Sequence, residues 1–171
     1  MATGFATNTT KQAGEYLVAA ELAKKKYVVA TFAGNVPEYD LIVADEKGRS
    51  IPVQVKAIWG GDWHFRADRF MHIEFDEESQ TQKGFKSRRL KMPDLIFVFV
   101  VLSENHDDRF FLLTQKEVRD IIVDEYRSWM KKIGGRRPRN PRSMHTIIRV
   151  RQIEMHENKW VLIDEMMRKA G

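Results

Sequence analysis

Apolar residues recur at helical spacing near the start of the chain. Ala13, Leu17 and Ala20 are three or four positions apart, and Thr9 or Thr10 before them can act as a helix cap. This pattern predicts a helix that runs to about residue 26, preceded by a flexible tail over residues 1–9.

Short β-branched and aromatic runs separated by turn residues predict a set of strands. They lie at residues 27–32, 38–44, 51–58, 94–102 and 109–113. The turn at residues 45–48 makes the second and third strands an antiparallel hairpin. The run at 94–102 is almost continuously apolar, which is typical of a central strand buried on both faces.

The second half of the chain predicts further helices. Thr114 can cap a helix from about Gln115 to Lys132, and a Pro/Gly/Arg-rich loop follows at residues 134–143. Residues 146–167 predict a short strand or helix and then a final helix near Trp160. Residues 62–93 are aromatic-rich and then charged, which predicts an extended segment followed by a helical or mobile one.

This order of elements predicts one mixed α/β domain over residues 1–171. We expect a small sheet of mixed strand direction, with the first helix on one side and the C-terminal helices on the other.

Composition narrows the class of protein. The 171 residues include no cysteine, which excludes disulfides and a thiolate zinc site and favours a cytoplasmic location. The first ten residues lack the apolar stretch of a signal peptide, and the longest apolar run, residues 95–102, is too short to cross a membrane.

Positive charge is concentrated in two segments. Residues 79–93 contain five basic residues and no acid, and residues 126–153 contain nine and no acid. Because the whole chain carries +5, the remaining residues carry a net charge of −9. Focused positive charge of this kind attracts polyanions, of which nucleic acid is the commonest, although a single basic run is as often a solvated surface.

Polar side chains interrupt two predicted strands. Asp40 lies in the second strand, and Gln54 and Lys56 lie two residues apart in the third, so their side chains share a face. Asp40, the Gln54 amide oxygen and the Val55 main-chain carbonyl are the oxygen ligands that Mg²⁺ prefers. Lys56 would then stand beside the attacking water or the charged transition state of phosphodiester cleavage.

Each of these residues also has a simpler interpretation. Asp40 could be a turn acid, and Gln54 with Lys56 the solvated face of a hairpin. Glu15, an acid of the predicted first helix that could join them, could be a surface acid. Their joint occurrence in this order favours the metal site.

The same residues resemble the PD-(D/E)XK nuclease superfamily, which includes restriction enzymes, Holliday-junction resolvases and intron homing endonucleases. The helix Gly14-Glu15-Tyr16-Leu17-Val18 is similar to the opening helix of the archaeal resolvase-like branch. The resemblance implies a restriction-endonuclease-like core, Asp40 and Gln54 as metal ligands, Glu15 as an auxiliary ligand and Lys56 as the catalytic lysine. Two departures are visible: proline does not directly precede Asp40, and Gln54 replaces the usual acid, giving a QxK variant.

Residues that could hold nucleic acid follow the third strand and occupy the basic segments. The aromatic Trp63 could stack on bases, and basic side chains around it and in the loop could bind phosphates. The basic candidates are Arg66, Arg69, Lys86, Arg88, Arg89, Arg136, Arg137, Arg139 and Arg142. The five histidines show no metal-ligand spacing.

The sequence therefore predicts a Mg²⁺-dependent DNA endonuclease, with Mn²⁺ as a substitute. Cutting two strands implies a homodimer or higher oligomer acting on double-stranded or branched DNA. The alternatives are a nuclease-fold nucleic-acid-binding module with little or no activity and, less favoured, an RNA-processing factor. Homing, resolvase and restriction roles are not separated by the sequence.

Overall fold

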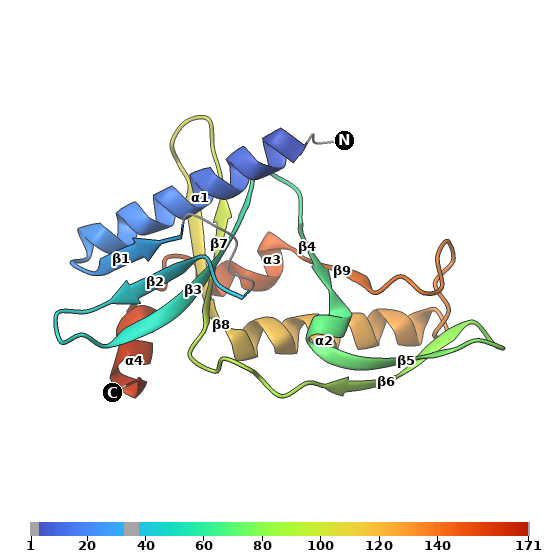
Figure 1. Cartoon of the computed structure of the whole chain (residues 1–171). Coiled ribbons are helices and arrows are strands. Elements are labelled where there is room, and N and C mark those ends of the chain that lie inside the picture. Colours follow the sequence, from blue (N-terminus) through green and yellow to red (C-terminus); the bar gives the residue numbers. More distant parts are fainter. Residues whose placement is uncertain (1–3, 33–37, 171) are drawn as a thin grey trace.

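A five-stranded sheet forms the centre of the protein. The computed structural model describes residues 4–32 and 38–170; residues 1–3, 33–37 and 171 lie outside the described ranges. The strand order is β1–β2–β3–β7–β8. These strands span Val28–Thr31, Leu41–Ala44, Ser50–Ile58, Ile96–Val101 and Arg109–Thr114 (Figure 1).

The sheet is mixed in direction. Strands β3 and β7 are parallel, with Val55 opposite Val98, whereas the other neighbouring pairs are antiparallel. The turn predicted at residues 45–48 joins β2 to β3. The expected mixed α/β class is confirmed.

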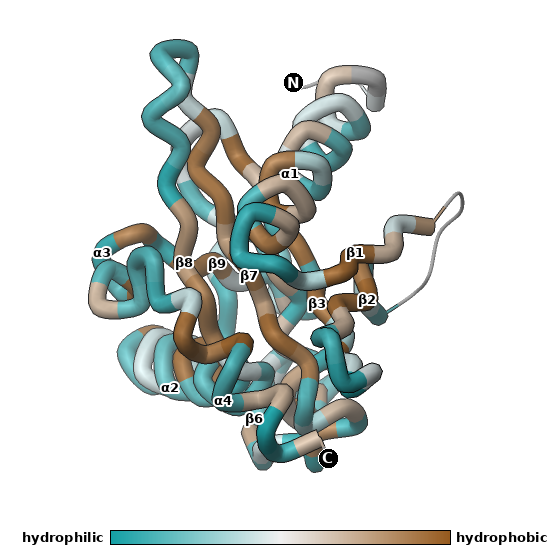
Figure 2. Tube along the Cα trace, turned by 90° about the vertical axis from the view of Figure 1, so that its left-hand side faces the viewer, coloured by the Kyte–Doolittle hydropathy of each residue, from teal (hydrophilic) through white to brown (hydrophobic). Residues whose placement is uncertain are grey.

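The two faces of the sheet carry different cores, because side chains alternate along each strand. In β7, Ile96 and Val98 belong to an aliphatic cluster, whereas Phe97 and Phe99 belong to an aromatic one. Helix α1 (Gly4–Lys24) packs on the aliphatic face, and helix α2 (Gln115–Lys132) covers the aromatic face. The hydrophobic β7 runs through the middle of the molecule (Figure 2).

The final helix, α4 (Val161–Lys169), corrects one expectation. Leu162, Ile163 and Met166 complete the aliphatic cluster beside α1, so α4 lies on the face of α1 and not on the opposite face. The amphipathic stripe of this helix was visible in the sequence, but a stripe does not specify which face of a sheet it covers.

Helix α1 also begins earlier than expected, at Gly4, so the prediction of a flexible tail is wrong for residues 4–9. The hydroxyls of Thr9 and Thr10 donate to the carbonyl of Ala6 inside the helix and do not cap it. Helix α2 begins and ends as predicted. Thr114 and Glu117 form a capping box at its start, which satisfies N–H groups that have no partner within the helix.

The extended segment predicted in residues 62–93 is present, but the charged part after it forms strand β6, where a helical or mobile segment was predicted. Strand β4 (Trp63–Arg66) and a 3-10 turn, η1 (Ala67–Arg69), lead into a hairpin of β5 (Met71–Asp76) and β6 (Thr81–Ser87). Strand β4 pairs with β9 (His145–Ile148), which precedes the short helices α3 (Val150–Ile153) and η2 (Glu154–His156).

Figure 1 shows the β5–β6 hairpin extending along α2, away from the central sheet. Within the described ranges, no helix has both the length and the apolar character needed to cross a membrane.

Candidate active site

Asp40 is fixed at the entrance to β2 by the main chain of β3. Its N–H donates to the Val53 carbonyl at 2.9 Å, and its Oδ2 accepts the N–H of Val55 at 2.9 Å. The side chain is only 6% exposed. One carboxylate oxygen is therefore committed to the protein, and Oδ1 is the oxygen that remains for another partner.

Glu15 reaches this site because α1 lies very close to β3. A Cβ atom built on Gly14 would lie 2.4 Å from the Cβ of Ala57, a separation that real Cβ atoms essentially never show. Only glycine allows this approach without displacing the helix. The missing side chain at Gly14 therefore brings the next residue, Glu15, close enough to Asp40 for both to contact Lys11.

Lys11 links the two carboxylates and is the site residue that sequence reasoning missed. Its Nζ lies 3.2 Å from Asp40 Oδ1 and 3.4 Å from Glu15 Oε1. Burial alone would lower the pKa of Lys11, but its two carboxylate partners raise it, so the ammonium form is favoured. The spacing of Lys11 and Glu15, one helical turn apart, is the signal that could have found it.

The ionisation of Glu15 is opposed by its surroundings. Burial raises the pKa of Glu15, and the negative charge of Asp40 raises it further, whereas Lys11 and Lys56 act in the opposite direction. Two partly buried carboxylates close together favour either a proton or a cation between them.

Lys56 and Gln54 project from β3 into a pocket of about 670 Å³. Burial lowers the pKa of the Lys56 amine; the charge of Asp40 opposes this shift, and those of Lys11 and Arg69 add to it. Gln54 makes no side-chain hydrogen bond with any residue in the described ranges, so its amide oxygen is available to a ligand.

Trp63 is a buried contact of this strand, which corrects its predicted role in base stacking. Its side chain is 3% exposed and packs edge-on against Phe99. The indole Nε1–H donates to the carbonyl of Lys56 at 2.8 Å. A ring buried in this way has no free face for a base, so the predicted stacking is wrong and Trp63 instead bonds to the main chain of Lys56.

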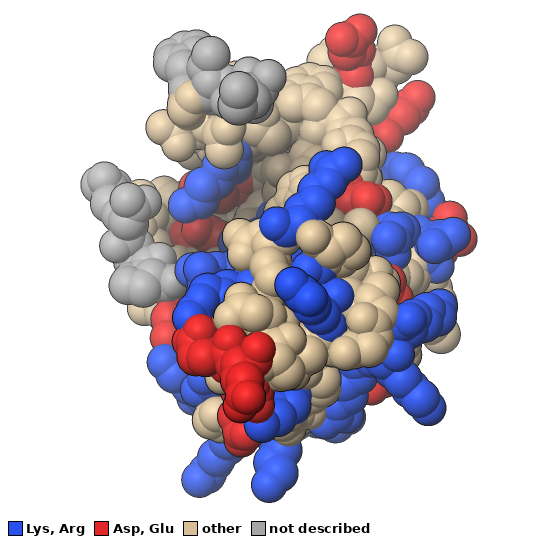
Figure 3. Space-filling view, turned by 90° about the vertical axis from the view of Figure 1, so that its right-hand side faces the viewer, with Lys and Arg blue, Asp and Glu red and all other residues tan. Residues whose placement is uncertain are grey.

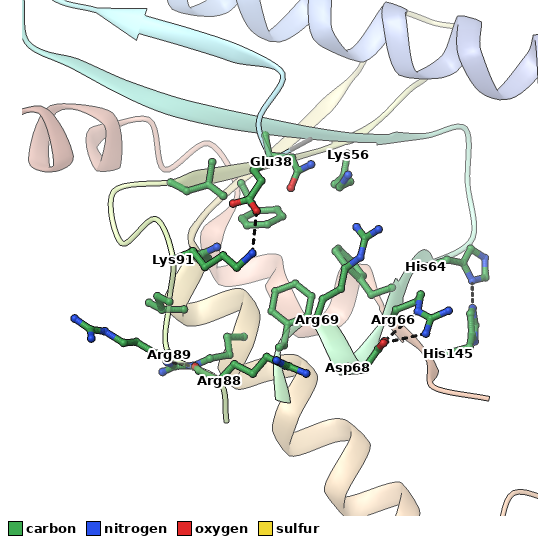
Figure 4. Close-up of a pocket in the computed structure, with 18 residues that line it drawn as sticks. Glu38, Lys56, His64, Arg66, Asp68, Arg69, Arg88, Arg89, Lys91 and His145 are labelled. Carbon is green, nitrogen blue, oxygen red and sulfur yellow. Dashed lines mark hydrogen bonds and ion pairs between the residues drawn. The ribbon is translucent and has the colours of Figure 1, made fainter. Parts of the chain in front are cut away.

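The pocket is predominantly basic (Figure 4). Arg69 extends toward Lys56, while each of the two acids that line the pocket is paired, Asp68 with Arg66 and Glu38 with Lys91. The basic side chains along its wall are Lys56, Arg66, Arg69, Arg88, Arg89, Lys91 and Arg119. Four of the predicted phosphate-binding arginines, at positions 66, 69, 88 and 89, thus converge on the pocket that holds Lys56.

Two histidines that the sequence left unassigned also line this pocket. His64 Nδ1 and His145 Nε2 are 2.7 Å apart across the β4–β9 pair. Burial lowers the pKa of His145, and the charges of His64 and Arg137 lower it further, which favours the neutral imidazole.

The basic loop, residues 134–143, lies beside the β5–β6 hairpin and not in the pocket. Arg136, Arg139 and Arg142 are exposed there, as is Lys86 on β6. Arg142 pairs with Glu77. Lysine and arginine side chains cover much of the lower part of this face (Figure 3).

Arg137 differs from the other arginines of the loop. It donates to the carbonyls of Ser143 and His145 and stacks on Trp129, so its guanidinium holds the loop together. The phosphate contact predicted for Arg137 stays a prediction beside this internal role.

The oxygen atoms at this site suit a hard divalent cation. Mg²⁺ is commonly held by one or two carboxylates and keeps several waters, and Asp40 Oδ1 with Glu15 provides two such carboxylates. Among the described residues, no group of three or more His, Cys, Asp or Glu side chains is arranged to hold a metal. A third protein ligand would therefore have to be a neutral oxygen, such as that of Gln54.

Comparison with known proteins bears on the fold. No protein-family model matches the sequence, and no curated protein matches it either. Among solved structures, the bacterial homing endonuclease I-Ssp6803I superimposes with a TM-score of 0.50 at 12% sequence identity, over 96% of this chain and 98% of that chain. The chain therefore shares its overall fold with that protein. The match extends over nearly the full length of both chains.

Proposed function

We propose that this protein is a metal-dependent DNA endonuclease with a PD-(D/E)XK-type site in which Gln54 replaces the usual acid. The observation that carries the proposal is the position of Lys56. It lies in a basic pocket and within electrostatic reach of Asp40 and Glu15, the two carboxylates joined through Lys11. The fold that this chain shares with a bacterial homing endonuclease supports the same conclusion.

In this proposal Asp40 and Glu15 would hold Mg²⁺ or Mn²⁺, together with the oxygens of Gln54 and Val55. When bound, the cation would polarise a phosphoryl oxygen and acidify a water. The half-buried Lys56 would take a proton from the attacking water or stabilise the charge of the pentavalent transition state. Its lowered pKa favours the first role, because the neutral amine is the form that accepts a proton.

The basic side chains of the pocket would bind the phosphates on either side of the cleaved bond. Each phosphate neutralised should add roughly 0.9 to the slope of log affinity against log salt concentration. Because both strands of a duplex must be cut, we further propose that the protein acts as a homodimer or higher oligomer.

The test is cleavage of supercoiled plasmid and of branched DNA with Mg²⁺ or Mn²⁺. Lys56→Met removes the amine and keeps the length of the side chain. Lys47→Met, in the exposed turn between β2 and β3, is the matched control. We expect Lys56→Met to lose about a hundredfold or more in rate, while the control cleaves like the wild type. Equal cleavage by all three proteins would refute the role of Lys56.

A second candidate is a nucleic-acid-binding module with little activity. The observation that favours it is Gln54, whose amide brings no negative charge to the cation. Salt-dependent DNA binding without cleavage by the wild type and by Gln54→Glu would support this candidate. Faster cleavage by Gln54→Glu would support the enzyme.

A further inference from the structure

The position of Lys11 has a consequence for any cation that enters this site. Its ammonium lies between Asp40 Oδ1, at 3.2 Å, and Glu15 Oε1, at 3.4 Å. Those are the two carboxylates to which the proposed function assigns a metal. The lysine therefore occupies the region in which a divalent cation would have to bind.

Asp40 presents one particular carboxylate oxygen to Lys11. Its Oδ2 accepts the Val55 N–H at 2.9 Å, and the carboxylate is 6% exposed. Oδ1 is the oxygen that accepts no main-chain hydrogen bond from the described residues, and it is also the one that faces Lys11. A metal ion and an ammonium group cannot share one oxygen at close range, because both are cations and their repulsion is strong where water is scarce.

The side chain of Lys11 is able to leave. It is 49% exposed and is carried on a flexible four-carbon stem on the surface of α1. Removing it without replacement would leave Asp40 facing Glu15, two carboxylates that repel each other, with Asp40 almost completely buried. A cation between them relieves this repulsion without protonating either carboxylate.

We propose that Lys11 is a built-in placeholder cation, which holds Glu15 and Asp40 together in the metal-free protein and must be displaced when a divalent cation binds. This inference rests on the proposed function, because it concerns the same carboxylates. Lys11 would then lower the metal affinity of the site, because a metal ion binds only when it displaces the ammonium group.

The experiment compares Mn²⁺ binding to the full-length, chelator-treated proteins by electron paramagnetic resonance. The variants are Lys11→Gln, which removes the charge, and Lys11→Arg, which keeps it. Lys24→Gln is the matched control, because Lys24 lies on the same helix and pairs with Glu21 at 2.6 Å, outside the site. Circular dichroism verifies that each variant is folded at the temperature of the titration.

We expect Lys11→Gln to bind Mn²⁺ roughly tenfold more tightly than the wild type, a size usual for coupled binding. Lys11→Arg and Lys24→Gln should bind like the wild type. Lys11→Gln should also melt at a lower temperature without metal and gain more from saturating Mn²⁺ than the wild type does.

Two other outcomes have separate meanings. Equal or weaker Mn²⁺ binding by Lys11→Gln, with binding intact in the wild type, overturns the placeholder and leaves the proposed metal site standing. Failure of both proteins to bind Mn²⁺ at millimolar concentrations overturns the metal site and the placeholder together.

Discussion

Replacing Gly14 by alanine should displace helix α1 and reduce the cleavage rate far more than it reduces the stability of the protein. The new Cβ would lie 2.4 Å from the Cβ of Ala57 and 3.4 Å from Cγ1 of Val55. Since carbon atoms in contact prefer about 3.5–4.0 Å, α1 must move away from β3 by about 1.1–1.6 Å. Glu15 is the next residue along the helix, so its carboxylate moves away from Asp40 and Lys56 by a similar amount.

The expected loss of stability is modest. Forcing an extra methyl group into a packed contact costs about 1–3 kcal/mol, whereas alanine is favoured over glycine inside a helix by about 0.8–1.0 kcal/mol. The net free energy of unfolding should therefore fall by about 0–2 kcal/mol. For a chain of this size, that lowers the melting temperature by up to about 8 °C.

The expected loss of activity is larger. A displacement of about 1 Å at a catalytic group can cost about a hundredfold in rate. Thermal unfolding and Mg²⁺-dependent plasmid cleavage measure the two effects side by side. Gly4→Ala is the control on the same helix, because a Cβ at Gly4 meets nothing within 4 Å.

A second substitution, at Ala57, should reverse the effect of Gly14→Ala. Adding Ala57→Gly to Gly14→Ala removes the opposing methyl group, so α1 can return and the cleavage rate should recover. The glycine costs about 0.5–1 kcal/mol in the strand, so stability recovers less than activity. Wild-type cleavage by Gly14→Ala, or no recovery in the double variant, would show that close packing of α1 does not position Glu15.

Two further predictions concern Trp63 and Glu15. Trp63→Phe keeps an aromatic ring but removes the donor to the Lys56 carbonyl, which should cost about 1–3 kcal/mol in denaturant unfolding; Trp59→Phe, at an exposed position, should cost almost nothing. Glu15→Gln should be more stable than the wild type at pH 7 in the presence of a chelator. Burial and Asp40 raise the pKa of Glu15 in the folded state, so the wild type loses stability as pH rises above about 4.5. Urea unfolding between pH 4 and 8 should show the two proteins converging at the acidic end, and a constant difference would contradict this cause.

Local sequence signals predicted much of the architecture. Helix α2 was predictable from Thr114 and the periodicity behind it, because a capping box is formed by residues three apart. The hairpin of β2 and β3, with Gln54 and Lys56 on one face, follows from a short turn and the two-residue period of a strand.

What the sequence could not provide are contacts between distant segments. The pairing of β4 with β9 brings His64 and His145 together although they are 81 positions apart, and nothing near either residue signals the other. The burial of Trp63 was not predictable either. The glycines before it suggested an exposed loop, whereas its ring packs against Phe99, which is distant in the sequence. The role of Lys11 likewise depends on how far α1 approaches β3, which is set by the missing side chain at Gly14.

The basic loop is held in place by hydrogen bonds within the protein. Gln82, 2% exposed, donates from its side chain to the carbonyls of Pro141 and Ser143, and its main-chain N–H donates to Gly135. Its amide oxygen accepts the hydroxyl of Tyr126 from helix α2. The backbone that carries Arg136 and Arg139 is therefore already ordered, and the conformational entropy of fixing it has been lost during folding. A polyanion that contacts this loop would then have only the side chains left to immobilise.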